Sequence, residues 1–171
     1  MRILPSSPKS REIIEMYRVI SRRLADPCLH NQLKPFFQRR LTLSELLEWV
    51  HATVKFSKGD IARHNDPFDI IEYGQGMCRE FSILFTAVCL ANGYRARIIL
   101  DMSDHAWTEV WNARQRRWIH VDPSERRMDA PEMYERDWRK NLVEVYAFED
   151  GVMEDVTKNY KIGVRNLSRH K

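Results

Sequence analysis

The chain of 171 residues has the length of one domain, and it can bury about two-thirds of the surface that the unfolded chain exposes, so it needs no metal or disulfide for stability. Hydrophobic residues make up 43% and charged residues 30%, which is typical of a soluble globular protein, and no apolar run approaches membrane-spanning length. The net charge of +4 arises from basic residues interleaved with acidic ones, so we expect neither a nucleic-acid nor a membrane partner.

The first third of the chain predicts helices rather than a site. Residues 1–8 are rich in Pro and Ser, and we expect a mobile leader. Apolar residues recur at helical spacing within residues 9–25, and Asp26 followed by Pro27 would end that helix. An irregular link is expected over residues 28–40.

A second helix is predicted from a capping box. Thr42 and Glu45 have the required spacing and precede an apolar-periodic run that extends to about Ser57. Neither of the two helices carries a catalytic pattern, so both are expected to pack against the core.

Cys78 opens the next predicted helix. An apolar-periodic run follows it, and Asn92 with Gly93 forms a C-terminal cap, so this helix would be roughly 14 residues long. In the first turn, unpaired N–H groups and the helix dipole favour the thiolate, as a nucleophile requires. For a cysteine taken alone, the alternative is a small buried hydrophobic residue.

Two alternating stretches after this helix predict a β-hairpin. Residues 105–111 and 117–122 alternate in polarity, and the polar residues 112–116 would connect them. With the turn centred near Arg114, His105 lies directly opposite Asp122. The hairpin alone would then pair an imidazole with a carboxylate.

The period of a strand places further polar residues beside this pair. Trp107 and Glu109 share the face of His105, whereas their neighbours along the strand form a more apolar face. Trp118 and His120 share the face of Asp122, and we expect a packing role for Trp118 and a structural or supporting role next to the catalytic residues for His120.

The remaining segments complete a sheet. Strands are predicted over residues 95–101, 142–148 and 152–156, and a short helical turn over 131–134. Helices first and strands afterwards define an α+β class, with N-terminal helices and a Cys-bearing helix packed on an antiparallel β-sheet. We expect a single domain over residues 1–171.

The three cysteines indicate a reducing environment. Cys28, Cys78 and Cys89 are odd in number and include no Cys-x-x-Cys pair, so a disulfide framework is not expected. The N-terminus has no apolar h-region of a secretory signal, and a cytoplasmic location is the expectation.

The chain resembles the transglutaminase-like superfamily of papain-like thiol enzymes. The pattern of that superfamily is a helix-opening Cys, a His at a strand start and an Asp at a strand end, and it matches Cys78, His105 and Asp122. Within the superfamily, the strings over residues 92–97, 104–110, 117–125, 134–142, 146–148 and 155–160 are similar to cytoplasmic peptide:N-glycanases. The resemblance covers roughly residues 72–160 and implies a transglutaminase-like, papain-like core whose catalytic part lies there.

This resemblance implies roles for further residues. Trp107, Glu109 and Glu125 would face the sugar of a glycopeptide substrate and its attachment. Those glycanases also carry two Cys-x-x-Cys zinc motifs before the nucleophile, whereas residues 29–77 of this chain contain no cysteine. We therefore expect no metal and no cofactor.

The predicted function is a cysteine-dependent amidohydrolase with a Cys-His-Asp triad, acting on the amide between an N-glycan and asparagine. The Cys78 N–H would stabilise the oxyanion, and Gln75 is a candidate second donor. One alternative keeps the triad but acts on unmodified protein, as a peptidase, deamidase or transamidase. Another is a non-catalytic module that binds peptide or glycan.

Overall fold

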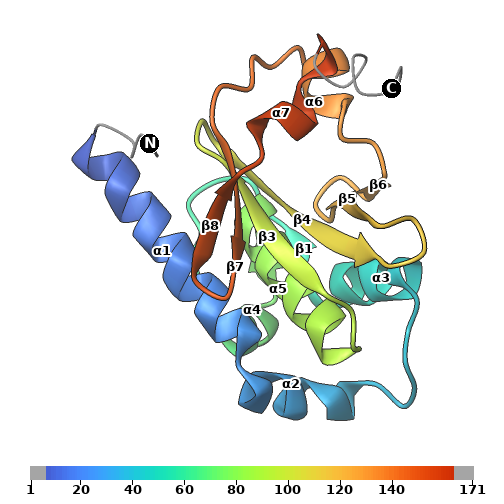
Figure 1. Cartoon of the computed structure of the whole chain (residues 1–171). Helices are drawn as coiled ribbons and strands as arrows, with labels where there is room; N and C mark the ends of the chain where they lie inside the picture. Colours follow the sequence, from blue (N-terminus) through green and yellow to red (C-terminus); the bar gives the residue numbers. More distant parts are fainter. Residues whose placement is uncertain (1–6, 164–171) are drawn as a thin grey trace.

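The computed structural model describes residues 7–163 and has helices packed on an antiparallel sheet (Figure 1). The helices are α1 (Pro8–Ala25), α2 (Pro27–Leu33), the 3-10 turn η1 (Lys34–Phe36), α3 (Leu43–Thr53), α4 (Pro67–Tyr73), α5 (Cys78–Ala91), α6 (Met133–Arg136) and α7 (Thr157–Tyr160). The strands are β1 (Lys55–Phe56), β2 (Gln75–Gly76), β3 (Ala96–Asp101), β4 (His105–Asn112), β5 (Arg117–Asp122), β6 (Arg127–Met128), β7 (Val145–Glu149) and β8 (Val152–Asp155). The α+β class is confirmed.

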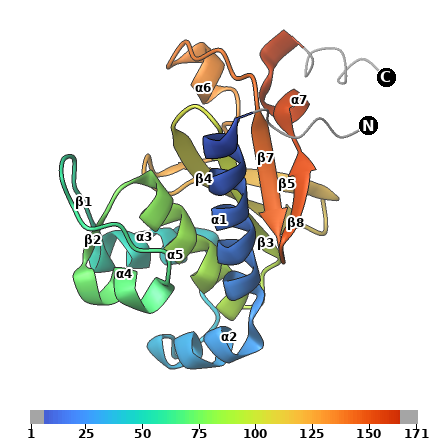
Figure 2. The same ribbon diagram turned by 90° about the vertical axis from the view of Figure 1, so that its left-hand side faces the viewer.

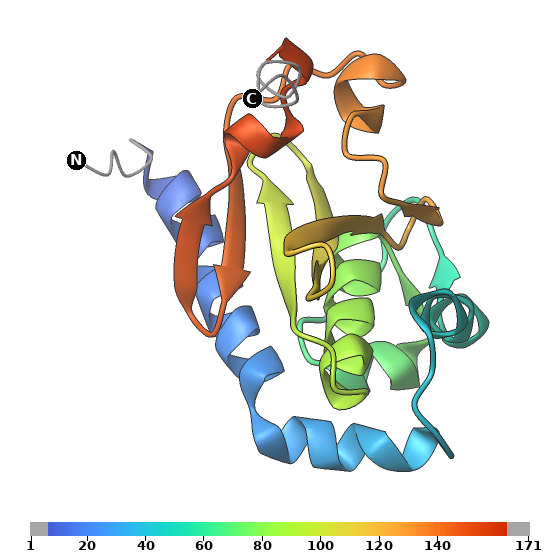
Figure 3. The same ribbon diagram turned by 45° about the vertical axis from the view of Figure 1, so that its right-hand side comes forward.

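The main sheet has six strands in the order β6-β5-β4-β3-β7-β8, and its pairings are antiparallel. Helix α5 packs against β3 and β4, and α1 to α4 surround it on that side (Figure 2). The short helices α6 (orange) and α7 (red) lie apart from α1 to α5 (Figure 3), and their buried residues pack with Trp107 in a separate core. The sheet therefore separates two layers of side chains.

Each layer has its own hydrophobic core, because successive strand residues point to opposite faces. The larger core contains most of the buried residues of α1 to α5 and the sheet residues that face them, such as Ala106 and Val110. The smaller core, which we call the aromatic core, contains Ile99, Trp107, Met133, Tyr134, Leu142, Val145, Ala147, Val156 and Tyr160. The C-terminal segments thus complete the second face of the sheet.

The N-terminal region differs from expectation at two places. Ser7 caps α1 and Pro8 begins it, so the expected leader does not include these two residues, and residues 1–6 lie outside the described part. The expected irregular link over residues 28–40 is largely helical, because the Asp26 side chain accepts a hydrogen bond from the Cys28 N–H and starts a new helix after Pro27. The capping box of α3 is confirmed, but that helix ends at Thr53.

The hairpin of β4 and β5 is confirmed, with a different register. Thr108 pairs with Val121, and Asn112 pairs with Arg117, which leaves a four-residue turn. The register continues so that Asp122 lies beside Trp107, two residues from the predicted partner His105. A shift by an even number keeps every side chain on its face, so the His–Asp contact survives as a diagonal one.

A two-stranded parallel sheet precedes the cysteine helix. Lys55 pairs with Gln75 and Phe56 with Gly76, and this joins the end of α3 to the start of α5. Among residues 7–163, no helix has the length and apolar character needed to cross a bilayer.

Candidate active site

Cys78 is the first residue of α5, as predicted, and its side chain is half-buried. The first α-helical bond there runs from the Phe81 N–H to the Met77 carbonyl oxygen, so the N–H of Cys78 has no partner within the helix. The Ser82 hydroxyl donates to the Cys78 carbonyl oxygen over 2.7 Å. The nucleophile candidate thus lies in the positive end of a helix dipole.

Glu80 anchors this helix start. Its carboxylate is fully buried, accepts the Met77 N–H at 3.0 Å, and receives two hydrogen bonds from Arg63, at 2.7 and 3.1 Å. Burial on its own raises the pKa of Glu80, but the bonds from Arg63 and Met77 outweigh it and hold that pKa below its usual value. The Arg63–Glu80 ion pair therefore holds the backbone at Met77, the residue that precedes Cys78.

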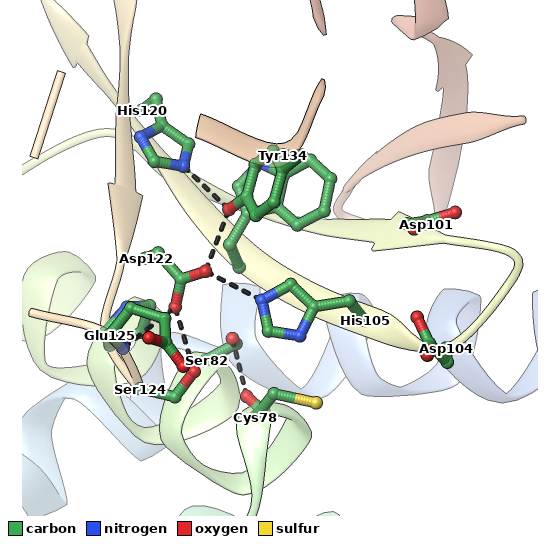
Figure 4. A network of polar contacts seen from close by, with 12 residues as sticks. Cys78, Ser82, Asp101, Asp104, His105, His120, Asp122, Ser124, Glu125 and Tyr134 are labelled. Carbon is green, nitrogen blue, oxygen red and sulfur yellow. Dashed lines mark hydrogen bonds and ion pairs between the residues drawn. The ribbon is translucent and has the colours of Figure 1, made fainter. Parts of the chain in front are cut away.

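His105 and Asp122 form the predicted pair. The His105 Nε2–H donates to Asp122 Oδ2 over 2.7 Å, and both residues are buried. In Figure 4 the ring lies between Asp122 and Cys78, with the other ring nitrogen directed toward the Cys78 side. The structure thus brings together the three residues that the sequence pattern singled out.

The charge of this group is shifted toward an imidazolium. Burial alone lowers the pKa of His105, but its interactions with Asp122 and then Cys78 outweigh burial and raise that pKa to about 9. Burial also raises the pKa of Asp122, yet hydrogen bonds from His105, Tyr134 and Ser124 bring it below its usual value. A cationic ring beside an anionic carboxylate is the state these contacts stabilise.

Asp122 accepts four hydrogen bonds. Besides His105, Tyr134 donates its O–H to Oδ2 at 2.9 Å, while Oδ1 accepts the Ser124 O–H at 2.9 Å and the Glu125 N–H at 3.2 Å. The carboxylate is fully buried, so these donors replace water. Their number explains how a charge persists there.

The structure separates the three expected substrate contacts. Glu125 is exposed next to Asp122, where a bound molecule could reach it (Figure 4). Trp107 is 0% exposed, and its Nε1–H donates to the Tyr160 hydroxyl at 2.9 Å. Glu109 accepts from Tyr160 at 2.6 Å and from Arg97 at 2.6 Å, and is 3% exposed.

The expectation that Trp107 and Glu109 face a sugar is therefore corrected. Both share the strand face of His105, but α6 and α7 cover that face beyond the strand start. Their polar atoms are already bound inside the aromatic core.

Two residues beside His105 and Asp122 have no sequence pattern that assigns them a role. Tyr134 lies on α6 and stacks on Trp107, with ring centroids 4.3 Å apart. The Trp138 ring packs edge-on against His105, with ring centroids 4.9 Å apart, and is 37% exposed, so part of its surface faces solvent beside His105. An aromatic residue in the charged stretch 135–140 is the one signal that points to Trp138. The candidate oxyanion donor Gln75 is exposed, three residues before Cys78.

Comparisons with known proteins agree with this architecture. The chain is 46% identical over 99 residues to the peptide-N(4)-(N-acetyl-beta-glucosaminyl)asparagine amidase of Arabidopsis thaliana, a match that covers 57% of this chain and 14% of that protein. The amidase of the same name from Homo sapiens is 42% identical over 98 residues, which are 57% of this chain and 15% of that protein. The match thus spans only about one-seventh of these relatives.

Structural likeness extends over nearly the whole chain. A crystal structure of Rad4-Rad23 bound to a 6-4 photoproduct UV lesion superimposes with a TM-score of 0.62 at 13% identity, covering 99% of this chain and 56% of that one. The Rad4 transglutaminase-like domain model matches residues 102–167. The model of the transglutaminase-like superfamily matches residues 22–123, which is more than half of the sequence, and so this chain belongs to the transglutaminase-like superfamily.

Proposed function

We propose that this chain is a cysteine-dependent amidohydrolase of the peptide:N-glycanase type, which cleaves the amide bond between an N-glycan and its asparagine side chain. The observation that carries the proposal is the 2.7 Å bond from His105 to Asp122, next to a cysteine at a helix start. The 46% and 42% identities to the two amidases, over 99 and 98 residues, support the substrate class.

The first half of the reaction forms a thioester. Asp122 accepts the Nε2–H, so Nδ1 is the ring nitrogen that takes the proton from the Cys78 thiol. The thiolate sulfur then forms a bond to the carboxamide carbon, and the carbonyl electrons move to oxygen. The unpaired Cys78 N–H at the helix start stabilises that oxyanion.

The second half releases both products. The imidazolium returns its proton to the amide nitrogen as the C–N bond breaks, so the sugar leaves as a glycosylamine. Water then attacks the thioester with His105 as the base, and the thiol is regenerated. The asparagine side chain has become an aspartate.

The substrate is proposed to approach from the side of Trp138 and Glu125. Trp138 presents a partly exposed ring next to His105, and Glu125 presents a carboxylate next to Asp122. An aromatic face suits the apolar side of a sugar ring, and a carboxylate suits its hydroxyls. In this proposal Trp107 and Glu109 do not contact the substrate, because both are buried and bind the Tyr160 hydroxyl inside the aromatic core.

The test is incubation with a denatured N-glycoprotein in water enriched in ¹⁸O. We expect the glycan to be released and the former asparagine to appear as aspartate carrying ¹⁸O by mass spectrometry. Cys78→Ser should abolish the reaction, and Asp122→Asn should reduce it by about 10³- to 10⁴-fold, because a neutral amide that can also donate no longer holds the ring in the tautomer with its proton on Nε2. Cys28→Ser, at an exposed cysteine, is the matched control and should keep full activity.

A result without deglycosylation separates the remaining functions. If unmodified glutamine or peptide bonds are cleaved instead, the same thiol chemistry serves a deamidase or peptidase. The likeness to the Rad4 domain favours a second candidate, a non-catalytic binding module, on fold alone. Equal behaviour of the parent and Cys78→Ser on every amide substrate would support that module and overturn the enzyme.

A further inference from the structure

A chain of three hydrogen bonds leads from the backbone to the carboxylate of Asp122. The Ala130 N–H donates to His120 Nδ1 at 3.3 Å, His120 Nε2 lies 2.7 Å from the Tyr134 hydroxyl, and that hydroxyl lies 2.9 Å from Asp122 Oδ2. His120, Tyr134 and Asp122 are all buried. Figure 4 shows the contacts of His120 with Tyr134 and of Tyr134 with Asp122, and the contact of Asp122 with His105, as dashed lines.

The hydrogen-bond pattern assigns a donor and an acceptor to each of these three contacts. A backbone N–H can only donate, so His120 Nδ1 accepts and the proton of the neutral ring is on Nε2. Nε2–H then donates to the Tyr134 oxygen, and the Tyr134 O–H is directed at Asp122. The carboxylate oxygen that holds His105 thus receives a second, oriented donor.

We propose that Tyr134 and His120 are positioning residues of the amide cleavage. They hold Asp122 Oδ2 as a charged acceptor, which keeps the proton of the neutral His105 ring on Nε2 and leaves Nδ1 free to take the proton of Cys78. This inference rests on the proposed function for its chemistry. Tyr134 acts on Asp122 directly, and His120 acts only through the Tyr134 hydroxyl.

The reason such a device is needed is the burial of Asp122. Without donors, a fully buried carboxylate would take a proton and become a neutral acid. It could then donate to His105 Nε2 and leave the proton on Nδ1, the tautomer that cannot deprotonate Cys78. The oriented Tyr134 hydroxyl favours the opposite arrangement.

Other charged groups face the same region. Glu125 and Tyr160 act electrostatically on Tyr134, and Asp104 lies close enough to His105 for their charges to interact. The side chains of Glu125 and Asp104 cannot replace the Tyr134 donor, because an ionised carboxylate has no proton to donate, and Asp104 pairs with Lys140. The effect of removing the hydroxyl should therefore be measurable above this background.

The experiment is the pH dependence of Cys78 alkylation by iodoacetamide in the full chain, read at each cysteine by mass spectrometry. Tyr134→Phe removes one hydrogen bond to a charged group. We therefore expect the acid limb of the profile, where the alkylation rate of Cys78 rises with pH, to move up by about one pH unit, so that the reaction at a given pH on that limb is about tenfold slower. His120→Leu should move it in the same direction, whereas His120→Gln, which keeps a donor, should stay near the parent. In the Tyr134→Phe background, His120→Leu should have no further effect.

The matched control is Tyr160→Phe. Tyr160 is equally buried in the aromatic core, but its hydroxyl contacts Glu109 and Trp107 rather than Asp122, so this variant should lower stability and leave the acid limb in place. An unchanged limb in Tyr134→Phe, or multiplied effects in the double variant, would overturn the proposal. Alkylation needs no substrate, so the effect of Tyr134 and His120 on Cys78 can be measured even if the chain cleaves no glycopeptide.

Discussion

Gly76 lies directly against Glu80: a Cβ added to Gly76 would stand 2.5 Å from the Glu80 Cβ. The neighbour is an atom fixed to the first turn of α5, so it cannot swing aside as the end of a flexible side chain would. The close approach lets β2 pass straight into the helix that carries Cys78.

Gly76→Ala should therefore destabilise the fold by about 1–3 kcal/mol, in the range of overpacked sites. We expect a lower urea midpoint and slower alkylation of Cys78, because the start of α5 must shift. Gly163→Ala is the control, since nothing lies within 4 Å of its added Cβ. Equal midpoints for the two variants would show that the approach is not constraining.

Arg63 should matter through the charge that it compensates. Arg63→Met leaves the fully buried Glu80 carboxylate without its main partner, and we expect a loss of about 2–4 kcal/mol at neutral pH. Because the pKa of Glu80 is lowered in the fold, this contribution is present above its ordinary value near 4.5 and disappears as the pH falls through the folded value. Urea unfolding at pH 7 and pH 3 measures the difference.

A surface pair provides the comparison for that experiment. Arg126 contacts Glu48 at 2.7 Å, but both side chains are at least half exposed, so Arg126→Met should change the stability very little. A loss as large as that of Arg63→Met would mean that burial of the acid is not the deciding factor.

The imidazole of His105 should titrate at about pH 9, which NMR of the ring can follow. Its folded pKa lies above the ordinary value near 6.5, so the stabilisation is complete below about pH 6.5 and is lost as the pH rises toward 9. Asp122→Asn should bring the midpoint down toward 6.5 or lower, because burial then acts without its opposing charge. A parent midpoint already at 6.5 would contradict this electrostatic picture.

The three cysteines should react with iodoacetamide in a fixed order at neutral pH. Cys78 should be fastest because it has His105 beside it in addition to a helix start, and the exposed Cys28, which lies in the first turn of α2 as well, should follow. Cys89 should react only on unfolding, since it is fully buried and burial raises the pKa of its thiol. Similar rates for Cys78 and Cys28 would argue against an activated nucleophile.

Local patterns in the sequence were enough to place the helix start at Cys78 and the hairpin that carries His105 and Asp122. Both depend on neighbouring residues, such as helical spacing and strand alternation. The register was wrong by two residues because the turn has four residues between Asn112 and Arg117, and Arg116 adopts the left-handed conformation with φ 51°. That choice is made by the backbone of the turn and leaves the strand pattern unchanged.

Burial on the second face of the sheet was not predictable from the same patterns. Trp107 and Glu109 alternate with His105 as predicted. Their polar atoms, however, are hydrogen-bonded to Tyr160 near the C-terminus and, for Glu109, also to Arg97 on the neighbouring strand. Tyr134 reaches Asp122 in the same way, from a short helix within a polar stretch. Strand period says which residues share a face, and only the tertiary fold says what covers it.

The two cores of the sheet have one more consequence. Cys78 begins α5 on the helical side, whereas the His105 ring contacts Trp107 and Tyr134 of the aromatic core. A partly folded chain in which α6 has not docked would therefore lack the Tyr134 hydroxyl that binds Asp122, so the imidazole beside Cys78 would be held less firmly until the C-terminal segments are in place.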